Sequence, residues 1–278
     1  MITYPMAALA EEIKKRGVEG GSFKGLTYQE WADELITRAA ETVAAHDEEW
    51  VAHGEDEGYY RFADFPPHFT PYANRLRDVP FNQSHTLAST MIVLWRLTGD
   101  ARYYDKVLRL ATRFKRSLKL TPEGAYVWLY WQRPGVYQVS GTGEDISHAA
   151  LNVTFAHDAF QTGLVFDEED MRRFARTLAA LVLRSPARSV RDACGREFEL
   201  PNISDAVTGG AAVNGYWNAV IRWFELARFD PEVWPRVDRV MNYIAQSQIC
   251  GRPAAGGPTM LLGQALALLY KPATLPAP

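Results

Sequence analysis

The sequence predicts an all-α protein built from repeated αα-hairpins. Three tight turns contain an aspartate, Asp100, Asp167 and Asp230, and these aspartates lie 67 and 63 residues apart. After each of them, apolar residues recur at the fourth, seventh, eleventh and fourteenth positions, which is the spacing of one helix face. A pattern that returns at a regular interval along the chain is typical of a helical repeat.

The repeats are predicted at residues 84–119, 145–184 and 214–248. Two further helices are expected within residues 4–50, and a last inner helix at 259–270, so that residues 1–278 form a single domain. The first helix of each hairpin is more apolar than the second, which predicts an inner layer surrounded by amphipathic helices. We therefore expect an α/α toroid, closed or incomplete. The alternative is a flat solenoid, which the long loops at one end of the hairpins disfavour.

Local signals locate several elements. Residues 4–16 predict a short amphipathic helix, and Thr27 with Glu30 forms a capping-box pattern for a helix that reaches about Trp50. The only β element expected is a short strand within residues 126–131. Residues 53–81 and 185–213 are predicted to be long connectors.

Composition excludes several classes of function. The chain has 278 residues and a net charge of −3, without a basic block, so nucleic acid is not an expected partner. No apolar run approaches the roughly 20 residues that a membrane helix needs. The N-terminus lacks the pattern of a signal peptide, which favours a cytoplasmic protein, or a secreted or periplasmic one if a signal has been removed. Cys194 and Cys250 fit free thiols in a reducing compartment.

If the inner helices point in one direction, their leading ends meet at one rim of the molecule. His85 and His148 occupy comparable positions there in consecutive repeats. His148 shares a helix face with Glu144 and Asn152, each one turn away. The other polar candidates at this rim are Asn82, Gln83 and Asn214.

Simpler roles compete with these functional ones. Ser84 and Asp145 fit helix N-caps, and the acidic run 167–170 fits the start of an outer helix, where acids complement the helix dipole. His157 falls on an apolar face and is predicted to be a core histidine. A zinc site from His85, His148 and Glu144 is an alternative, but the only close ligand spacing in it is the four-residue spacing of Glu144 and His148, so neither a metal nor another cofactor is the expectation.

Aromatic residues gather on the connectors at the same end of the hairpins. Flat rings beside forked donors are what a sugar site requires, because rings stack on pyranose faces and donors bind hydroxyls or carboxylates. The residues predicted to contribute are Trp128, Tyr130, Trp131, Arg133, Tyr216 and Trp217.

Three segments resemble α/α-toroid carbohydrate-active enzymes, in particular polysaccharide lyases and uronate C5-epimerases. They are Leu94-Trp95-Arg96-Leu97-Thr98-Gly99-Asp100 with the following Tyr103-Tyr104, the aromatic run 126–131, and Glu-Asp-Ile-Ser-His at 144–148. The resemblance covers residues 80–250 and implies an enzyme that acts on an anionic, uronate-containing saccharide by β-elimination or epimerisation. In this scheme His148 or His85 is the base and Tyr216 or Tyr130 the acid. The substrate carboxylate is neutralised by Asn82, Gln83 or Asn214.

Two other functions remain open from the sequence. An inverting glycoside hydrolase would pair Glu144 or Asp145 with Glu55 or Asp56, at the roughly 6.5–9.5 Å that such carboxylates need. A helical-repeat protein without enzymatic activity would use the same rim to bind a partner. The final inner helix lacks an outer partner in the sequence, which favours a homo-oligomer.

Overall fold

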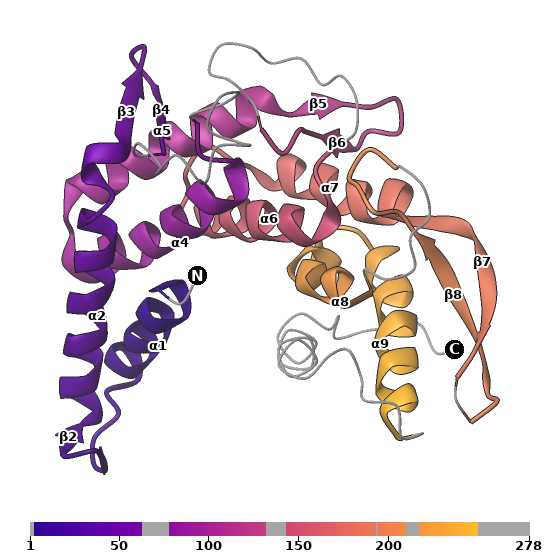
Figure 1. Ribbon diagram of the computed structural model, residues 1–278, viewed down its shortest axis with the longest axis horizontal. Coiled ribbons are helices and arrows are strands. Elements are labelled where there is room, and N and C mark those ends of the chain that lie inside the picture. Colours follow the sequence, from indigo (N-terminus) through magenta and orange to yellow (C-terminus); the bar gives the residue numbers. More distant parts are fainter. Residues whose placement is uncertain (1–2, 63–77, 132–142, 193, 210–216, 250–278) are drawn as a thin grey trace, which may run out of the picture. The chain divides into compact units, whose positions relative to one another are not determined.

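The computed structural model describes residues 3–62, 78–131, 143–192, 194–209 and 217–249. This part of the chain is mostly helical, with eight α-helices and four separate two-stranded antiparallel sheets (Figure 1). It divides into two compact units. The first comprises Met1–Arg116, Trp131–Tyr137 and Asp158–Val165, and the second comprises Ser117–Tyr130, Gln138–His157 and Phe166–Pro278.

Four helices make up most of the first unit: α1 (Thr3–Arg16), α2 (Tyr28–Ala44), α4 (Phe81–Thr98) and α5 (Ala101–Ser117). Helix α1 packs against both α2 and α4. Small residues permit this close approach, because Ala7 and Ala10 on α1 and Ala32 and Ala39 on α2 are fully buried. The predicted N-terminal helices are therefore confirmed.

The start of α2 has the predicted capping box. The Thr27 hydroxyl accepts from the Glu30 amide at 3.2 Å, and the Glu30 carboxylate accepts from the Thr27 amide at 2.7 Å. The helix ends at Ala44, earlier than predicted, and a 3₁₀ turn (Asp47–Glu49) follows it.

The turn between α4 and α5 is as short as the sequence predicts. Gly99 adopts a left-handed conformation with φ 71°, and its N–H donates to the Trp95 carbonyl at 2.8 Å. Asp100 then accepts from the Arg102 amide at 2.9 Å at the beginning of α5. Helix α4 is buried along most of its length, whereas α5 carries a charged face, so the two helices differ in apolar character as the sequence predicts.

Short hairpins complete the first unit. Strand β1 (Ser22–Phe23) pairs with β2 (Leu26–Thr27), and β3 (Trp50–His53) pairs with β4 (Glu57–Tyr60). Residues 53–60, predicted to belong to a loop, thus contain a strand.

The helices of the second unit are α6 (Ile146–Gln161, of which the last turn belongs to the first unit), α7 (Glu168–Arg176), α8 (Trp217–Val220) and α9 (Val233–Ile249). Helix α7 continues as a π-helix (Thr177–Val182), and α8 continues as a 3₁₀ helix (Ile221–Arg228). The Asp167 carboxylate accepts from the Asp170 amide at 2.9 Å and caps α7, which confirms the structural role predicted for the acidic run. The largest fully buried side chains of this core are Trp128, Phe155, Phe174, Trp223 and Phe224.

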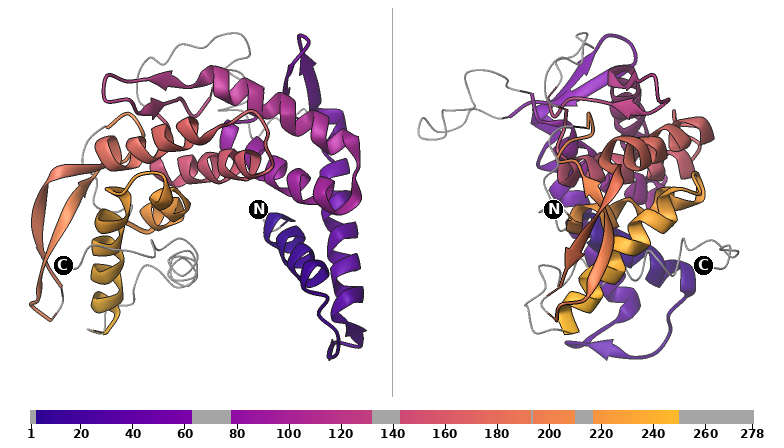
Figure 2. Two further views of the ribbon diagram at one scale, coloured as in Figure 1. Left: turned by 180° about the vertical axis from the view of Figure 1, so that it is seen from behind. Right: turned by 90° about the vertical axis from the view of Figure 1, so that its right-hand side faces the viewer.

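The strands of the second unit differ most from the sequence prediction. Strands β7 (Leu183–Arg191) and β8 (Glu197–Ile203) form a twisted ribbon where a connector was expected (Figure 2). Pro186 and Pro201 argue against strands in a sheet interior. Both lie between the Arg184–Asn202 and Arg188–Leu200 pairs, where the register is irregular and a missing N–H is tolerated. The strand predicted within 126–131 is limited to β6 (Tyr126–Val127), which pairs with β5 (Lys119–Leu120).

Cys194 lies in the turn between β7 and β8 and is disulfide-bonded, so the prediction of a free thiol at this position was wrong. Its amide donates to the Asp192 carboxylate at 2.8 Å. Across the described residues, no helix is long and apolar enough to span a bilayer. The helix predicted at 259–270 lies outside the described residues, and closure of the repeats into one toroid domain stays a prediction.

Candidate functional site

The candidate site lies in the second unit, at the N-terminal end of α6. The extended segment that precedes this helix is held on two sides. The Glu144 amide donates to the Trp128 carbonyl at 3.1 Å, and the Glu144 carbonyl accepts from the Val207 amide at 2.9 Å. The Ile146 amide donates to the Asp205 carbonyl at 3.0 Å, which fixes the first residue of α6.

Asp145 is both the cap of α6 and the partner of His148. Its Oδ1 accepts from the amides of Ser147 and His148, at 3.0 and 3.2 Å, while its Oδ2 is bonded to His148 Nδ1. Burial raises the pKa of the Asp145 carboxyl, but hydrogen bonds from His148 and Ser147 outweigh it, so this pKa lies below its ordinary value. Asp145 is therefore an ionised acceptor.

This pairing orients the imidazole of His148. Because an ionised carboxylate only accepts, the hydrogen lies on Nδ1, and a neutral ring keeps its basic lone pair on Nε2. The His148 side chain is 44% exposed, and the structure gives Nε2 no partner among the described residues. A partly exposed imidazole that is oriented through Nδ1 has the geometry of a general base.

Tyr130 lies beside this histidine. The ring centroids of Tyr130 and His148 are 5.2 Å apart, in an edge-to-face arrangement. A phenol can donate a proton from its hydroxyl, so a proton donor and a proton acceptor lie next to one another here. The neighbouring Trp131 is half-buried.

Glu144 points the opposite way, into the core of the second unit. Its side chain is fully buried, and Oε2 accepts from Trp128 Nε1 and Asn152 Nδ2, while Oε1 has no partner among the described residues. Burial raises the pKa of Glu144 well above its ordinary value, the charge of Asp145 adds to this, and the two N–H donors oppose it. Trp128 and Asn152 are also fully buried, and Trp128 packs against Phe174 and Trp223.

The other predicted histidine belongs to the first unit. His85 is fully buried, with its ring 5.3 Å from that of Phe81 and 4.6 Å from that of Phe114. Asn82 is buried near the start of α4, and Gln83 is exposed. The convergence of these residues with His148 stays a prediction.

Several predicted site residues lie outside the described part of the chain: Arg133, Asn214 and Tyr216. Trp217 begins α8. Within the described residues, no group of three His, Cys, Asp or Glu side chains is arranged to hold a metal.

The structure also describes His157, which the sequence predicts to be a core histidine, and Asp56, which it suggests as a carboxylate of a hydrolase. His157 is 2% exposed, and its Nε2 lies 3.0 Å from an Arg228 guanidinium nitrogen. Burial, with a smaller effect of the Arg228 charge, lowers the pKa of His157 to about 4, so it is the neutral core histidine that was predicted. Asp56, a carboxylate considered for a hydrolase, is bound by Arg116, which lowers its pKa.

The contact that the sequence interpretation missed is the bond between Asp145 and His148. The sequence offered Asp145 as a helix cap or as a carboxylate of a hydrolase, but not as the partner of this histidine. The three-residue spacing of these two side chains on one helix end is the signal that was available. Comparison with known proteins gives no match: no family model, curated protein or solved structure matches this chain.

Proposed function

We propose that the chain is a carbohydrate-active enzyme that removes the C5 proton of a uronate residue, with His148 as base. The observation that carries the proposal is the bond between Asp145 and His148 Nδ1, beside Tyr130, at the start of α6. An aspartate that fixes the tautomer of a histidine is a recurring way to prepare a general base.

The proposed reaction is a β-elimination. Nε2 of His148 takes the C5 proton, the electron pair of the C5–H bond forms the C4–C5 double bond, and the C4–O bond breaks. The Tyr130 hydroxyl gives its proton to the departing glycosidic oxygen, and the proton on His148 returns to Tyr130 through solvent. An epimerase would use the same base and return a proton to the opposite face of C5.

The negative charge that develops at C5 must be spread into the substrate carboxylate, which requires donors that neutralise it. Of the residues that the sequence suggests for this task, Asn214 is the one that belongs to the same unit as His148.

The test combines two assays on the same uronic acid polymers. Ultraviolet absorbance of a conjugated C4–C5 double bond reports elimination, and incorporation of solvent deuterium at C5 reports proton removal by either a lyase or an epimerase. We expect His148→Ala to lower both signals by about 100-fold or more, as is typical of the loss of a general base. Tyr130→Phe should lower elimination more than deuterium exchange, because it removes only the acid.

His46 offers a matched control. It bonds a carboxylate three residues away through Nδ1, at 2.6 Å from Glu49, and its side chain is 43% exposed, close to the value for His148. His46→Ala should leave both signals unchanged. Absence of both signals with every uronan, or full activity of His148→Ala, would contradict the proposal. Release of reducing sugar without a double bond would favour the hydrolase instead.

The variant Asp145→Asn distinguishes the two roles of Asp145, which are to cap α6 and to hold the imidazole of His148. Asparagine is as good an N-cap as aspartate, so α6 should begin normally. Its neutral amide no longer stabilises the imidazolium that forms when His148 takes a proton. We expect kcat to fall at least tenfold with little change in KM or thermal stability.

A further inference from the structure

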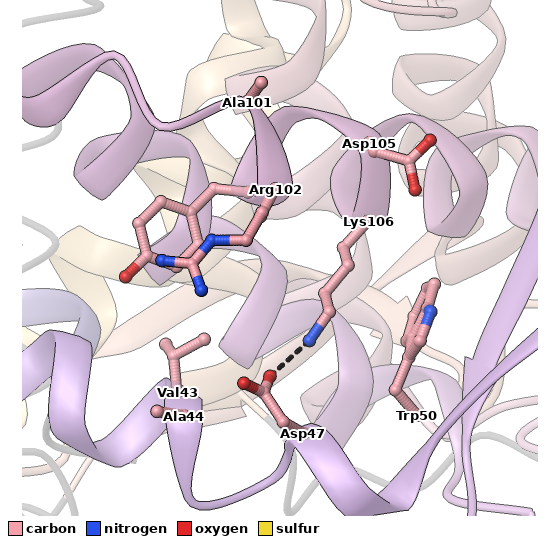
Figure 3. A pocket seen from close by; sticks show the side chains of 9 residues that line it. Val43, Ala44, Asp47, Trp50, Ala101, Arg102, Asp105 and Lys106 are labelled. Atoms are coloured by element: carbon pink, nitrogen blue, oxygen red, sulfur yellow. Dashed lines mark hydrogen bonds and ion pairs between the residues drawn. The ribbon is translucent and has the colours of Figure 1, made fainter.

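The first unit contains a pocket of about 510 Å³, between the end of α2, the start of β3 and the first turns of α5 (Figure 3). We infer that it binds a neutral polyhydroxylated ligand of the size of a mono- or disaccharide. Its volume lies within the range of small-molecule sites in proteins. The inference does not rest on the proposed catalytic function, because every residue that lines the pocket belongs to the first unit.

The pocket offers an apolar wall. Val43 and Ala44, at the end of α2, line it together with the indole of Trp50. Trp50 is half-buried, and the ammonium of Lys106 lies 5.5 Å from its ring centroid. An aromatic ring with an aliphatic neighbour supplies the surface against which the C–H groups of a sugar ring pack.

A charged pair supplies the polar groups. The side chains of Asp47 and Lys106 point toward one another in the pocket and form an ion pair (Figure 3). An ammonium has three donors and a carboxylate accepts through two oxygens, so this one bond leaves hydrogen-bonding capacity on both groups. Adjacent donors and acceptors of this kind match the vicinal hydroxyls of a sugar, each of which both donates and accepts.

The charge around the pocket selects a neutral ligand. Two acids, Asp47 and Asp105, and two bases, Arg102 and Lys106, line it. Arg102 is further bound by Asp100 at 2.7 Å, and Asp105 by Arg109 at 3.0 Å. Neither sign of charge is left in excess, so the pocket gives an anion or a cation no net attraction. A uronate is thus a poorer ligand than the corresponding neutral sugar.

The experiment is a titration of the ¹⁵N-labelled full-length protein with glucose, galactose, mannose and their disaccharides, and with glucuronate for comparison. The indole N–H signal of Trp50 is assigned by its absence from Trp50→Phe. We expect this signal to shift in a saturable way with at least one neutral sugar. Lys106→Met keeps the aliphatic stem beside Trp50 but removes the ammonium, and should weaken binding about tenfold, the effect of one charged hydrogen bond.

Lys14 provides the matched control, because its ammonium pairs with Asp33 at 2.7 Å between α1 and α2, in the same unit. Lys14→Met should leave the affinity unchanged, as should His148→Ala. If Lys106→Met does not fold, as judged by its thermal unfolding curve, Asp47→Asn serves in its place with the same expectation. The inference is overturned if no neutral sugar shifts the Trp50 signal, if the pocket variants bind as tightly as the wild type, or if glucuronate binds there more tightly than glucose.

Discussion

Asp158 provides a direct test of the energetics of the first unit. It lies in the last turn of α6, and its carboxylate accepts from the hydroxyl of Tyr4 at 3.4 Å and from Ser89. The residue as a whole retains some exposure, but its Oδ2 is sealed from solvent and has no partner among the described residues. Burial raises the pKa of this carboxyl from 3.8 to about 6, against the opposing effects of Ser89, Tyr4 and the charge of Arg96, while Glu11 adds a smaller increase.

The sign of the pH effect follows from this direction. A carboxyl whose pKa is raised by folding holds its proton more tightly in the folded state. Its contribution to stability is therefore complete below pH 3.8 and is lost as the pH rises through about 6. A difference of about 2 pH units corresponds to about 3 kcal/mol, so ionisation of Asp158 lowers the free energy of unfolding by about that amount above pH 7.

Asp158→Asn removes this ionisation. The free energies of unfolding of the variant and the wild type differ by two contributions. One comes from the new amide and is the same at every pH, and the other comes from the lost ionisation and depends on pH. Subtracting the difference measured at pH 4 from that measured at pH 7.5 removes the first contribution. We expect this difference to favour the variant by about 2.5 kcal/mol, slightly less than the full value of the abolished ionisation, because the unfolded carboxyl is already partly ionised at pH 4.

Urea denaturation at a series of pH values measures this quantity, provided that the slope with denaturant stays constant. Asp33→Asn is the control, because the Asp33 side chain is 67% exposed and pairs only with Lys14 in the described structure. For this control, the stability differences at pH 7.5 and pH 4 should agree within about 0.5 kcal/mol, since an exposed ion pair contributes little to stability. Parallel pH profiles for the wild type and Asp158→Asn would refute the assignment of a raised pKa to this buried carboxyl.

Three further predictions concern single residues. Thr27→Ala should lower the free energy of unfolding by about 1 kcal/mol in urea denaturation, because it removes the hydroxyl that caps α2, whereas Thr27→Ser should not. Glu144→Gln keeps an oxygen for the N–H groups of Trp128 and Asn152. Because folding raises the pKa of Glu144, urea denaturation should find this variant about as stable as the wild type at pH 4 and more stable than the wild type at neutral pH. Glu144→Ala removes the acceptor of both donors and should lose about 2–4 kcal/mol at pH 4. Titration of thiols in denatured, non-reduced protein should find none, because Cys194 is disulfide-bonded and the chain has one other cysteine; one or two reactive thiols would contradict the bond.

Features set by neighbouring residues could be predicted from the sequence. The caps at Thr27 and Asp167 and the tight turn at Gly99 each depend on four or five consecutive residues, and the structure contains all three. The buried character of His157 also followed from local periodicity, because a histidine on an apolar helix face has few other places to lie.

Features that depend on distant partners were not predictable in the same way. Strands β7 and β8 form a ribbon, although the prolines and charged residues of both segments predict a loop. These segments become strands because they pair with one another. The bond between Asp145 and His148 is local, but its importance depends on Tyr130, which reaches the same place from a different part of the chain.

The pair Glu144 and Asp145 shows how distant pairing decides the chemistry of neighbouring residues. In an extended segment, successive side chains point to opposite sides. The bridge between Asp145 and Ala206, with the flanking bonds to Asp205 and Val207, fixes which side each of them takes. Glu144 therefore enters the core, where burial raises its pKa, and Asp145 reaches His148, where hydrogen bonds lower its pKa. A shift of one residue in this pairing would exchange the two environments and leave His148 without its acceptor. Adjacent carboxylates thus acquire opposite properties from a register that is set about 60 residues further along the chain.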